Sequence, residues 1–522
     1  MARNIVLATL PSHTHRTSEE NMGIGYLAAV LRKADYLVAV IDGWLLGYNN
    51  EQIARKILEI PSPVFVGLSC YECSLEDASI TIAKLRADGC NAPIIGGGYG
   101  PTFHEEEFLH IGFNFVIRGE AEESILQLAR ALENKKVDIS GVSGLSWLGQ
   151  SGAICRNNKS APVANLDSLP FPARDTIAKT MARKNPIHLV TSRGCQAACL
   201  FCSVASFIRD MHRAPSWRSR SISNIVDEIA YLHETFGVSC FKIVDDSFIE
   251  SSRDIRWIED FVAELIRRNL SIIFRTQIRS DRITEEIVEI LTGVGWFATS
   301  IGVENGSPTA LKRMNKTASV EQNKQSLQLL EQYGVYVQMG MILFDHETIM
   351  MELEENLEFL SELNWPVTKG IFTEMYAAEG TPFARMLVRR KLVTDRKHGN
   401  YSYGHRNMPI SLVHGALKGW HRSHSAVYDR AINPIGAPKV LPKDGYSEYH
   451  KICLRLYRMD LAFFSVLLDS VKSDPNFDSI MELTESRILD SQREYLQISG
   501  QLELLDKKYG LVYDAESNPF LD

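Results

Sequence analysis

Several features that define whole classes of protein are absent from this sequence. No stretch of about 18 apolar residues runs uninterrupted, and the apolar run at the N-terminus is short and ends before Pro11, so neither a membrane-spanning helix nor a signal peptide is expected. The sequence has no long run of Lys and Arg, and its formal net charge is −8. Nucleic acid and membranes are therefore not expected as partners, and we expect a cytoplasmic protein.

Cysteine is also scarce. Nine cysteines in 522 residues are too few, and odd in number, for the disulfide framework of a small secreted protein. No internal repeat and no low-complexity tract is present. The chain is instead long and apolar enough, with 45% hydrophobic residues, for two or three globular domains with full-sized cores.

The N-terminal quarter alternates short β-rich runs with helical stretches, which predicts βαβ units around a buried parallel sheet of the doubly wound, Rossmann-like kind. The predicted segments are Ile5–Leu10, Gly25–Lys33, Leu37–Asp42, Glu51–Leu58, Val64–Ser69, Leu75–Ala87, Ala92–Gly96 and Phe115–Arg118. Such a sheet binds ligands beyond the carboxyl ends of its strands. The candidates there are Pro11–His15, Asp42–Gly43, Ser69–Tyr71 and Gly96–Pro101.

Four regions are predicted along the chain. Residues 1–137 form the first α/β domain, and residues 138–185 form a hairpin, with its turn at Gly149–Gly152, followed by a linker. Residues 186–394 resume the alternation in longer units, which predicts a partial or full (β/α) barrel of the TIM type. Residues 395–522 are mainly helical, and we expect them to form a cap over the substrate. Six barrel strands are predicted: Ile187–Ser192, Cys240–Asp245, Ile272–Gln277, Ala298–Val303, Val335–Leu343 and Gly370–Tyr376.

Three cysteines are clustered directly after the first barrel strand. Cys195, Cys199 and Cys202 are separated by three and then two residues, and three thiolates on one loop can hold three irons of a cubane cluster. The fourth iron is then left open for a substrate or cofactor. A zinc site would need a fourth ligand, and no Cys or His lies between Cys202 and His212. The spacing alone leaves three unrelated loop cysteines as an alternative.

This loop, with Phe201 before its last cysteine, resembles the signature of the radical S-adenosylmethionine (SAM) superfamily. Five downstream segments resemble the strand ends of the branch with an N-terminal cobalamin-binding domain, and the resemblance extends over about residues 1–390. They read WRSRSISNIVDEI, FKIVDDSF, SIGVENGSPTALKRMNK, MGMILFDHET and YAAEGTPFARML. The resemblance implies a [4Fe–4S] cluster held by Cys195, Cys199 and Cys202, which cleaves SAM to a 5′-deoxyadenosyl radical.

Residue roles follow from the resemblance position by position. Phe201 is expected to pack against the adenine of SAM, and Glu304 to contact its ribose or amino group. Other barrel residues are candidates for cofactor binding, with capping or ion-pair roles as the alternative: Asp245, Asp246, Arg275 and Gln277. Glu374 and Tyr376 on the sixth strand are candidates for the substrate side, although a buried core tyrosine is equally compatible with the pattern.

The resemblance also implies cobalamin as a cofactor of the first domain. The residues expected to bind it are Ser69, Gly96, Gly97, Gly98, Tyr99, Gly119 and Glu120. Glycines allow close approach of the backbone to a ligand, but a tight turn would also explain them. The D-x-H-x-x-G motif, by which some cobalamin proteins supply a histidine to cobalt, is absent, so no lower axial ligand is assigned.

Other candidate groups have simpler explanations. Cys70 and Cys73 have the spacing of a redox or zinc pair, but no second pair accompanies them, so we expect packing roles. His13 and His15 follow the first strand and could touch cobalamin or merely be solvated. His421 and His424 have helical i, i+3 spacing that suits a metal but lack carboxylates nearby in sequence.

The sequence therefore predicts a cobalamin-dependent radical SAM methyltransferase that methylates an unactivated carbon of a small molecule. One SAM would methylate cobalamin and a second would yield the radical. The resemblance implies an external electron donor of the flavodoxin or ferredoxin kind. A non-methylating radical enzyme of the same architecture (dehydratase, epimerase, cyclase or ring-contracting oxidase) is one alternative. A cobalamin or Fe–S sensor without turnover is another.

Overall fold

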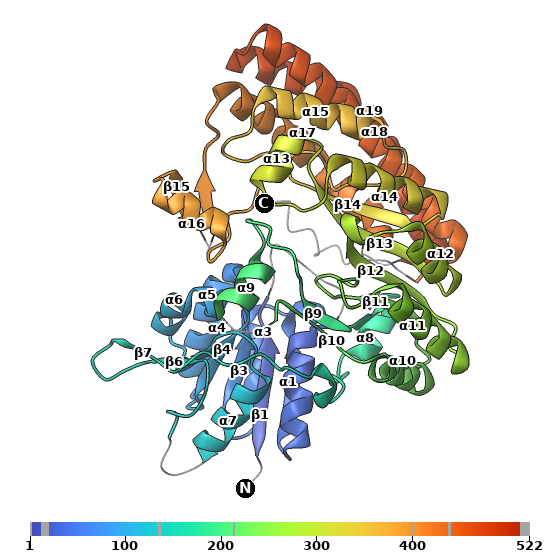
Figure 1. The fold of residues 1–522 in the computed structure, drawn as a ribbon. Helices are drawn as coiled ribbons and strands as arrows, with labels where there is room; N and C mark the ends of the chain where they lie inside the picture. The colour runs from blue at the N-terminus through green and yellow to red at the C-terminus, as the bar shows by residue number, and fades with distance from the viewer. Residues whose placement is uncertain are drawn as a thin grey trace.

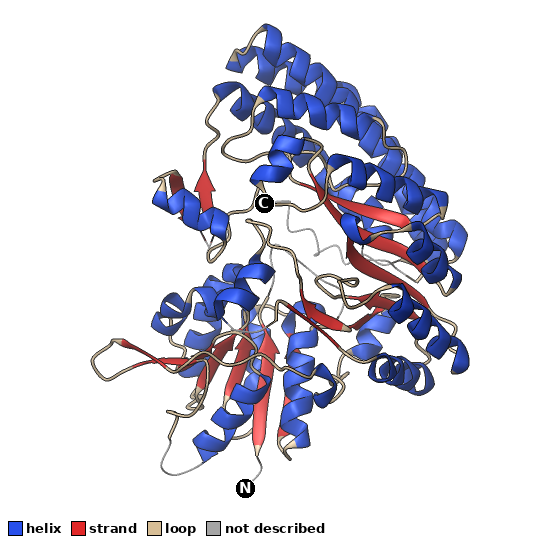
Figure 2. Cartoon of the chain, viewed as in Figure 1, coloured by secondary structure: helices blue, strands red, loops and turns tan. Residues whose placement is uncertain are grey.

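The first third of the chain forms a doubly wound sheet. The structure, a computed structural model, describes residues 3–11, 20–133, 138–211, 215–397, 400–436 and 440–511. Seven strands lie in the order β2-β1-β3-β4-β5-β6-β7, and the first five are parallel (Figures 1 and 2). Their bounds are β1 Asn4–Thr9, β2 Leu37–Asp42, β3 Val66–Ser69, β4 Ile94–Gly97, β5 Phe115–Ile117, β6 Leu145–Leu148 and β7 Ile154–Arg156.

Alternating residues of β1 explain why both faces of this sheet are covered. Ile5 and Leu7 belong to the core beneath α1 (Met22–Lys33) and α7 (Glu122–Glu133). Val6 and Ala8 belong to the core on the opposite face, which other helices cover. Those helices are α3 Asn50–Leu58, α4 Leu75–Ala87 and α6 Glu105–His110. The predicted α/β alternation is confirmed, and Leu37–Asp42 and Leu75–Ala87 match their predicted bounds.

The predicted hairpin is present as β6 and β7, with its turn between Leu148 and Ile154. β6 pairs antiparallel with β5, so the hairpin extends the sheet of the first domain. It is followed by irregular chain that includes the short α8 (Ile177–Ala182).

The second sheet is a partial barrel of five parallel strands in the order β14-β13-β12-β11-β8. Its strands are β8 Ile187–Leu189, β11 Cys240–Ile243, β12 Ile273–Arg279, β13 Trp296–Glu304 and β14 Tyr336–Met341. The helices that follow these strands are α10 Ile222–Phe236, α11 Ile255–Arg267, α12 Glu285–Gly293, α13 Pro308–Arg313, α14 Val320–Gln332 and α15 Met350–Ser361. Of the predicted sixth strand, Gly370–Tyr376, only Glu374 forms a bridge, with Phe344, and a second isolated bridge lies before it, at Val367. Gly370, where the predicted strand begins, has φ +107°, which separates the two bridges.

The region from residue 382 onward contains a β-hairpin as well as helices. After α16 (Pro382–Arg389), β15 (Val393–Lys397) and β16 (Asn400–Tyr403) form a hairpin. Although the sequence signals for strands fade here, Tyr401 donates its backbone N–H to Ala377, which fastens the hairpin to the sixth-strand segment. Three long helices follow: α17 Met408–Gly436, α18 Lys443–Ser473 and α19 Phe477–Tyr509.

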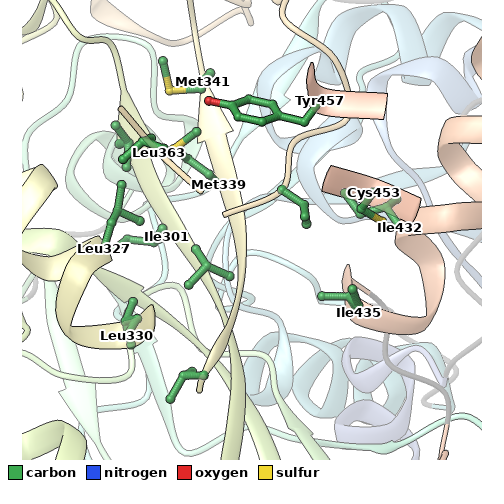
Figure 3. Packing of buried hydrophobic residues seen from close by; sticks show 14 of the residues in the cluster. Ile301, Leu327, Leu330, Met339, Met341, Leu363, Ile432, Ile435, Cys453 and Tyr457 are labelled. Carbon is green, nitrogen blue, oxygen red and sulfur yellow. The ribbon is translucent and has the colours of Figure 1, made fainter. Parts of the chain in front are cut away.

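The long helices share the hydrophobic core of the barrel. Ile432, Cys453 and Tyr457 face the β14 side chains Met339 and Met341 across this core (Figure 3). The helical region therefore shares one hydrophobic core with the barrel, and its role as a cap over the substrate stays a prediction. No helix among the described residues is long and apolar enough to cross a membrane.

Candidate active site

The cysteine loop leaves β9 (Ser192–Gly194), which pairs with β10 (Trp217–Ser219). Gly194 has φ +90°, and a Cβ there would lie 2.0 Å from the Ser216 carbonyl oxygen, so only glycine fits this bend. The loop is then held from two sides. Leu200 donates its N–H to Met314 O at 3.0 Å and accepts from Phe383 N at 3.0 Å. The barrel thus fixes the loop through backbone bonds that do not use the thiols.

All three thiols of the loop are largely shielded from water. Burial raises the pKa of Cys195 to about 12 and also raises the pKa values of Cys199 and Cys202. A bound metal is what stabilises a thiolate in such a place. The three sulfur atoms are not among the described groups whose ligand atoms all lie within 4.8 Å of one another, so they do not converge on a single ion.

Charged residues at the ends of the barrel strands surround the thiols. Cys195 Sγ lies 3.3 Å from Glu250 Oε1, and Arg279 of β12 lies 3.5 Å from the same carboxylate. Glu304, at the end of β13, pairs with Lys316 at 3.0 Å, and both lie close enough to Cys199 to shift its pKa in opposite directions.

Glu304 also occupies an unusual backbone conformation. Its φ is +72°, and the pairing of β13 with β14 shifts its register between Gly302 and Glu304. A non-glycine residue in the left-handed region costs energy and recurs at functional sites. The bulge turns the Glu304 carboxylate toward Lys316 and the cysteine loop, where SAM was predicted to bind.

Phe201 lies beside the thiols on a half-buried surface. It packs against the small hydrophobic cluster that includes Met314, Met375 and Phe383. Its ring is therefore held by the barrel end and by α16, and part of it remains accessible.

Arg275 and Gln277 of β12 point to the same face of the sheet because they are two residues apart. The Arg275 guanidinium donates to Gln338 Oε1 at 2.9 Å and to the Ser300 hydroxyl, whereas the Gln277 side chain is exposed. Arg275 is thus engaged with neighbouring strands, and Gln277 remains available on this face of the barrel.

Two adjacent aspartates at the end of β11 have different environments. Asp245 is buried, and its carboxylate accepts hydrogen bonds from Thr191 N at 2.7 Å and Ser192 Oγ at 2.6 Å. Arg253 pairs with it at 3.4 Å. This is the capping and ion-pair role, because every partner belongs to the scaffold.

Asp246 instead lines a cavity and accepts one hydrogen bond, from Gly194 N at 2.9 Å. Burial raises its pKa to about 6. The neighbouring carboxylate of Asp245 adds to that shift, so Asp246 is the member of the pair that faces a site.

The cavity has a volume of about 390 Å³ and lies between the two sheets, within the usual range for small-molecule pockets of about 300–1,000 Å³. All seven residues predicted to bind cobalamin line it: Ser69, Gly96, Gly97, Gly98, Tyr99, Gly119 and Glu120. Its other wall is formed by Asp246 and by α9 (Ser203–Met211), which begins directly after Cys202. The cavity and the cysteine loop therefore share a wall.

Gly97 and Gly98 of this cavity are glycines for different structural reasons. Gly98 has φ +102°, and a Cβ would lie 2.6 Å from Cys70 O, so the fold itself requires glycine there. At Gly97 a Cβ would meet only Ile117 O, at 4.0 Å. Protein packing does not explain that glycine, and a ligand lying close to the backbone does.

Two other lining residues connect the domains. Tyr99 stacks near Phe207 of α9, with ring centroids 4.8 Å apart. Glu120 pairs with Arg218 of β10 at 2.5 Å and accepts from Val163 N at 2.9 Å. Glu120 therefore fixes the barrel against the first domain at the rim of the cavity.

The remaining candidates divide between packing and open surface. Cys70 is buried in the first core and its sulfur contacts Leu68 O, in keeping with the predicted packing role. His13 and His15 lie outside the described residues. Tyr376 is 51% exposed, and Glu72 and Cys73 of the first domain act on its pKa, so Tyr376 faces the other domain rather than the core.

Two histidines of α17, His421 and His424, are stacked on aromatic rings. His421 stacks on Phe372 with centroids 4.0 Å apart, and His424 stacks on Tyr495. Neither belongs to a metal-binding group among the described residues.

Sequence reasoning did not single out Glu250, and its position after β11 was the one signal that could have found it.

Two family models match the chain. The B12 binding domain matches residues 7–145, and the Radical SAM superfamily matches residues 189–360. The chain is a radical SAM enzyme with a B12-binding domain. The match places the glycines of the cavity in one domain and the cysteine loop in the other. The predicted family is therefore confirmed.

Individual proteins are similar over most of the chain. An uncharacterized methyltransferase, PH0819 of Pyrococcus horikoshii, is 26% identical over 67% of this chain and 74% of its own length. The 4′-phospho-dehydrooxetanocin synthase of Priestia megaterium is 27% identical over 68% of this chain but 51% of its own length. The structure of OxsB, described as a cobalamin-dependent SAM radical enzyme, covers 99% of this chain and 82% of its own with a TM-score of 0.78 at 20% identity, which shows a shared fold.

The family implies a [4Fe–4S] cluster, SAM and cobalamin as cofactors, and the residues present fit these groups. Three shielded thiols that do not converge on one point suit three corners of a cluster better than a single ion. An open cradle at Gly97 and an apolar cavity suit an extended ligand on the first domain.

Proposed function

We propose that this enzyme transfers a methyl group to an unactivated carbon of a small molecule. The observation that carries the proposal is the shared wall between the glycine cavity and the cysteine loop, formed by α9 and Asp246. This wall supports the proposal that cobalamin and SAM bind next to each other. One of the similar proteins is named a methyltransferase.

The proposed roles of the residues follow from their positions. When bound, the cluster supplies the electron that cleaves SAM to a carbon radical, and cobalamin carries the methyl group. Cys195, Cys199 and Cys202 hold the cluster. Glu304, with Lys316 beside it, accepts a hydrogen bond from the ribose or the amino group of SAM, and Phe201 packs against the adenine.

The first domain positions the second cofactor. Gly96, Gly97 and Gly98 admit it against the backbone, while Ser69 and Gly119 line the same cavity. Tyr99 and Asp246 exclude water where the cavity approaches Cys202, because both are half-buried in its wall. Excluding water protects a radical from quenching.

A non-methylating reaction is the second candidate, because another similar protein is named a synthase rather than a methyltransferase and the cluster loop is compatible with either reaction. Glu374 and Tyr376, together with Gln277, are proposed to face the substrate in both cases. The substrate pocket, rather than the cofactor sites, decides between the two reactions.

The discriminating experiment is anaerobic turnover with SAM and a strong reductant after reconstitution with iron, sulfide and hydroxocobalamin. Methyl transfer yields both 5′-deoxyadenosine and S-adenosylhomocysteine, and the S-adenosylhomocysteine should form only with bound cobalamin. 5′-Deoxyadenosine without S-adenosylhomocysteine, once a substrate is found, would favour the non-methylating reaction. If the cluster-loaded enzyme formed neither product, both candidates would be contradicted.

We further propose a cytoplasmic enzyme with an external flavodoxin- or ferredoxin-like electron donor. None of the nine cysteines forms a disulfide, which suits a reducing compartment. The proposed domain bounds remain 1–137, 138–185, 186–394 and 395–522, with β6 and β7 packed on the first domain.

A further inference from the structure

A second group of metal-binding side chains lies away from the cysteine loop. Glu374 of the sixth-strand segment, His405 after β16 and His414 of α17 each offer one ligand atom. These three atoms all lie within 4.8 Å of one another. The three residues come from separate segments that the hairpin and α17 bring together, so their convergence does not follow from sequence spacing.

Both imidazoles are oriented by groups outside this cluster. His405 Nδ1 donates to the Asp345 carbonyl oxygen at 3.0 Å, so its neutral form carries the lone pair on Nε2. A backbone hydrogen bond with Phe372 likewise favours a proton on the His414 ring. A main-chain carbonyl bonded to the outer ring nitrogen is the usual arrangement behind a metal-bound histidine, because it fixes the tautomer and the ring plane.

The facing nitrogens are close enough to share a cation. His405 Nε2 and His414 Nδ1 are 2.8 Å apart, and if each ring keeps its proton on its carbonyl, two lone pairs oppose each other. Two nitrogens bound to one tetrahedral zinc lie about 3.3 Å apart, given Zn–N distances of about 2.0–2.1 Å. An opening of about 0.5 Å would therefore convert the pair into ligands.

The surroundings favour a fixed site. Phe344 stacks on His414 with centroids 4.6 Å apart, which restrains the ring. Tyr403, whose hydroxyl donates to Met375 O at 2.7 Å, lies beside the Glu374 carboxylate. Lys418, one turn further along α17, is the competing positive charge, and its side chain is exposed, so it can extend into solvent. The Asp345 carboxylate is already paired with Arg313 at 2.8 Å and does not compete for the site.

We propose that Glu374, His405 and His414 bind one divalent cation of the zinc class. Two imidazoles and one carboxylate form the ligand set of open zinc sites, in which a fourth position remains for water or a substrate oxygen. The same set also holds iron(II) in non-haem iron enzymes. The site uses none of the cluster thiols. It includes Glu374, which is proposed above to face the substrate, but it does not depend on which of the two reactions takes place.

The test is zinc binding to enzyme that carries its full iron–sulfur cluster, because empty cluster thiols would themselves bind zinc. Zinc is titrated anaerobically, and bound zinc and iron are measured by plasma mass spectrometry. We expect about one zinc per chain beside about four irons. His414→Gln should weaken zinc binding at least 100-fold and Glu374→Gln about 10- to 100-fold. His233→Gln, which alters a histidine that also bonds a backbone carbonyl (Val238 O), should bind as the unaltered enzyme does.

An iron content equal to that of the unaltered enzyme shows that each variant is folded. Zinc K-edge absorption gives a second measurement, with a first shell of nitrogen and oxygen at about 2.0–2.1 Å and no sulfur expected. Less than about 0.1 zinc per chain in the presence of excess zinc would overturn the proposal. Equal zinc in the His414 variant, or a sulfur shell around the zinc, would also overturn it.

Discussion

The candidate sites at the carboxyl ends of the two parallel sheets are lined by different kinds of groups. In the first domain the site consists of glycines and backbone, with Gly97 leaving open space. In the barrel it consists of charged side chains held by ion pairs, such as Glu304 with Lys316. A backbone cradle suits a large ligand held by shape, whereas charged groups around shielded thiols suit electron transfer and the chelation of a polar ligand.

The largest expected effect lies at the barrel end. Cys199→Ala should leave less than about one iron per chain and reduce 5′-deoxyadenosine formation at least 1,000-fold, because two thiolates no longer hold three corners of a cluster. Anaerobic iron analysis and product assay measure this. The matched control is Cys240→Ala, which removes a buried cysteine outside the loop and should keep its iron. Full iron and activity in the Cys199 variant would contradict the account.

The next effect concerns the scaffold beneath the barrel site. Asp245→Ala should lower the free energy of unfolding by about 3–5 kcal/mol, because Arg253, fully buried beside it, loses its partner. Chemical denaturation followed by circular dichroism measures the loss. Asp260→Ala, at an exposed position on α11, should change stability by less than about 0.5 kcal/mol. Similar values for the two variants would show that Asp245 is not a scaffold residue.

The backbone cradle can be filled without disturbing the fold. Gly97→Leu should raise the Kd for hydroxocobalamin about 100-fold, because its side chain enters the cavity while meeting no protein atom closer than 4.0 Å at Cβ. Equilibrium dialysis measures binding, and thermal unfolding checks the fold. Gly141→Leu, at another position with open space around the Cβ, is the control. Unchanged affinity in the Gly97 variant would place cobalamin elsewhere.

The smallest effect separates Asp246 from its neighbour. The pKa of Asp246 is raised to about 6 from 3.8, so the folded protein holds its proton more tightly than the unfolded chain does. Its contribution favours folding below about pH 4 and is lost as the pH rises toward about 6.

Asp246→Asn should therefore raise the free energy of unfolding of cluster-free protein by about 1–3 kcal/mol near pH 7 and by much less near pH 4. Urea denaturation at both pH values measures this difference. A loss of stability at both values would mean that Asp246 acts as a scaffold residue like Asp245.

The sequence predicted the fold of both domains because hydrophobic periodicity is local. Leu37–Asp42 and Leu75–Ala87 show this, since a strand or helix of that length reveals its own pattern. The sixth barrel strand was overestimated because regular pairing with a neighbouring strand cannot be read from apolar residues. Within Gly370–Tyr376 only Glu374 forms a bridge, with Phe344.

The candidate sites could be predicted only in part. Glycine runs and a cysteine loop are contiguous motifs, so Gly96–Gly98 and Cys195–Cys202 were found. The different roles of Asp245 and Asp246 depend on Thr191 and Arg253, which are distant in sequence. His414 was missed because its partners arrive from two other segments.

The most direct test of the account is an anaerobic crystal structure of the reconstituted enzyme with hydroxocobalamin and SAM. The account predicts cobalamin against Gly96–Gly98, and SAM between Glu304 and the iron left open by Cys195, Cys199 and Cys202, with α9 between the two sites. Cobalamin bound away from the glycine cavity, or SAM bound away from the cysteine loop, would contradict it.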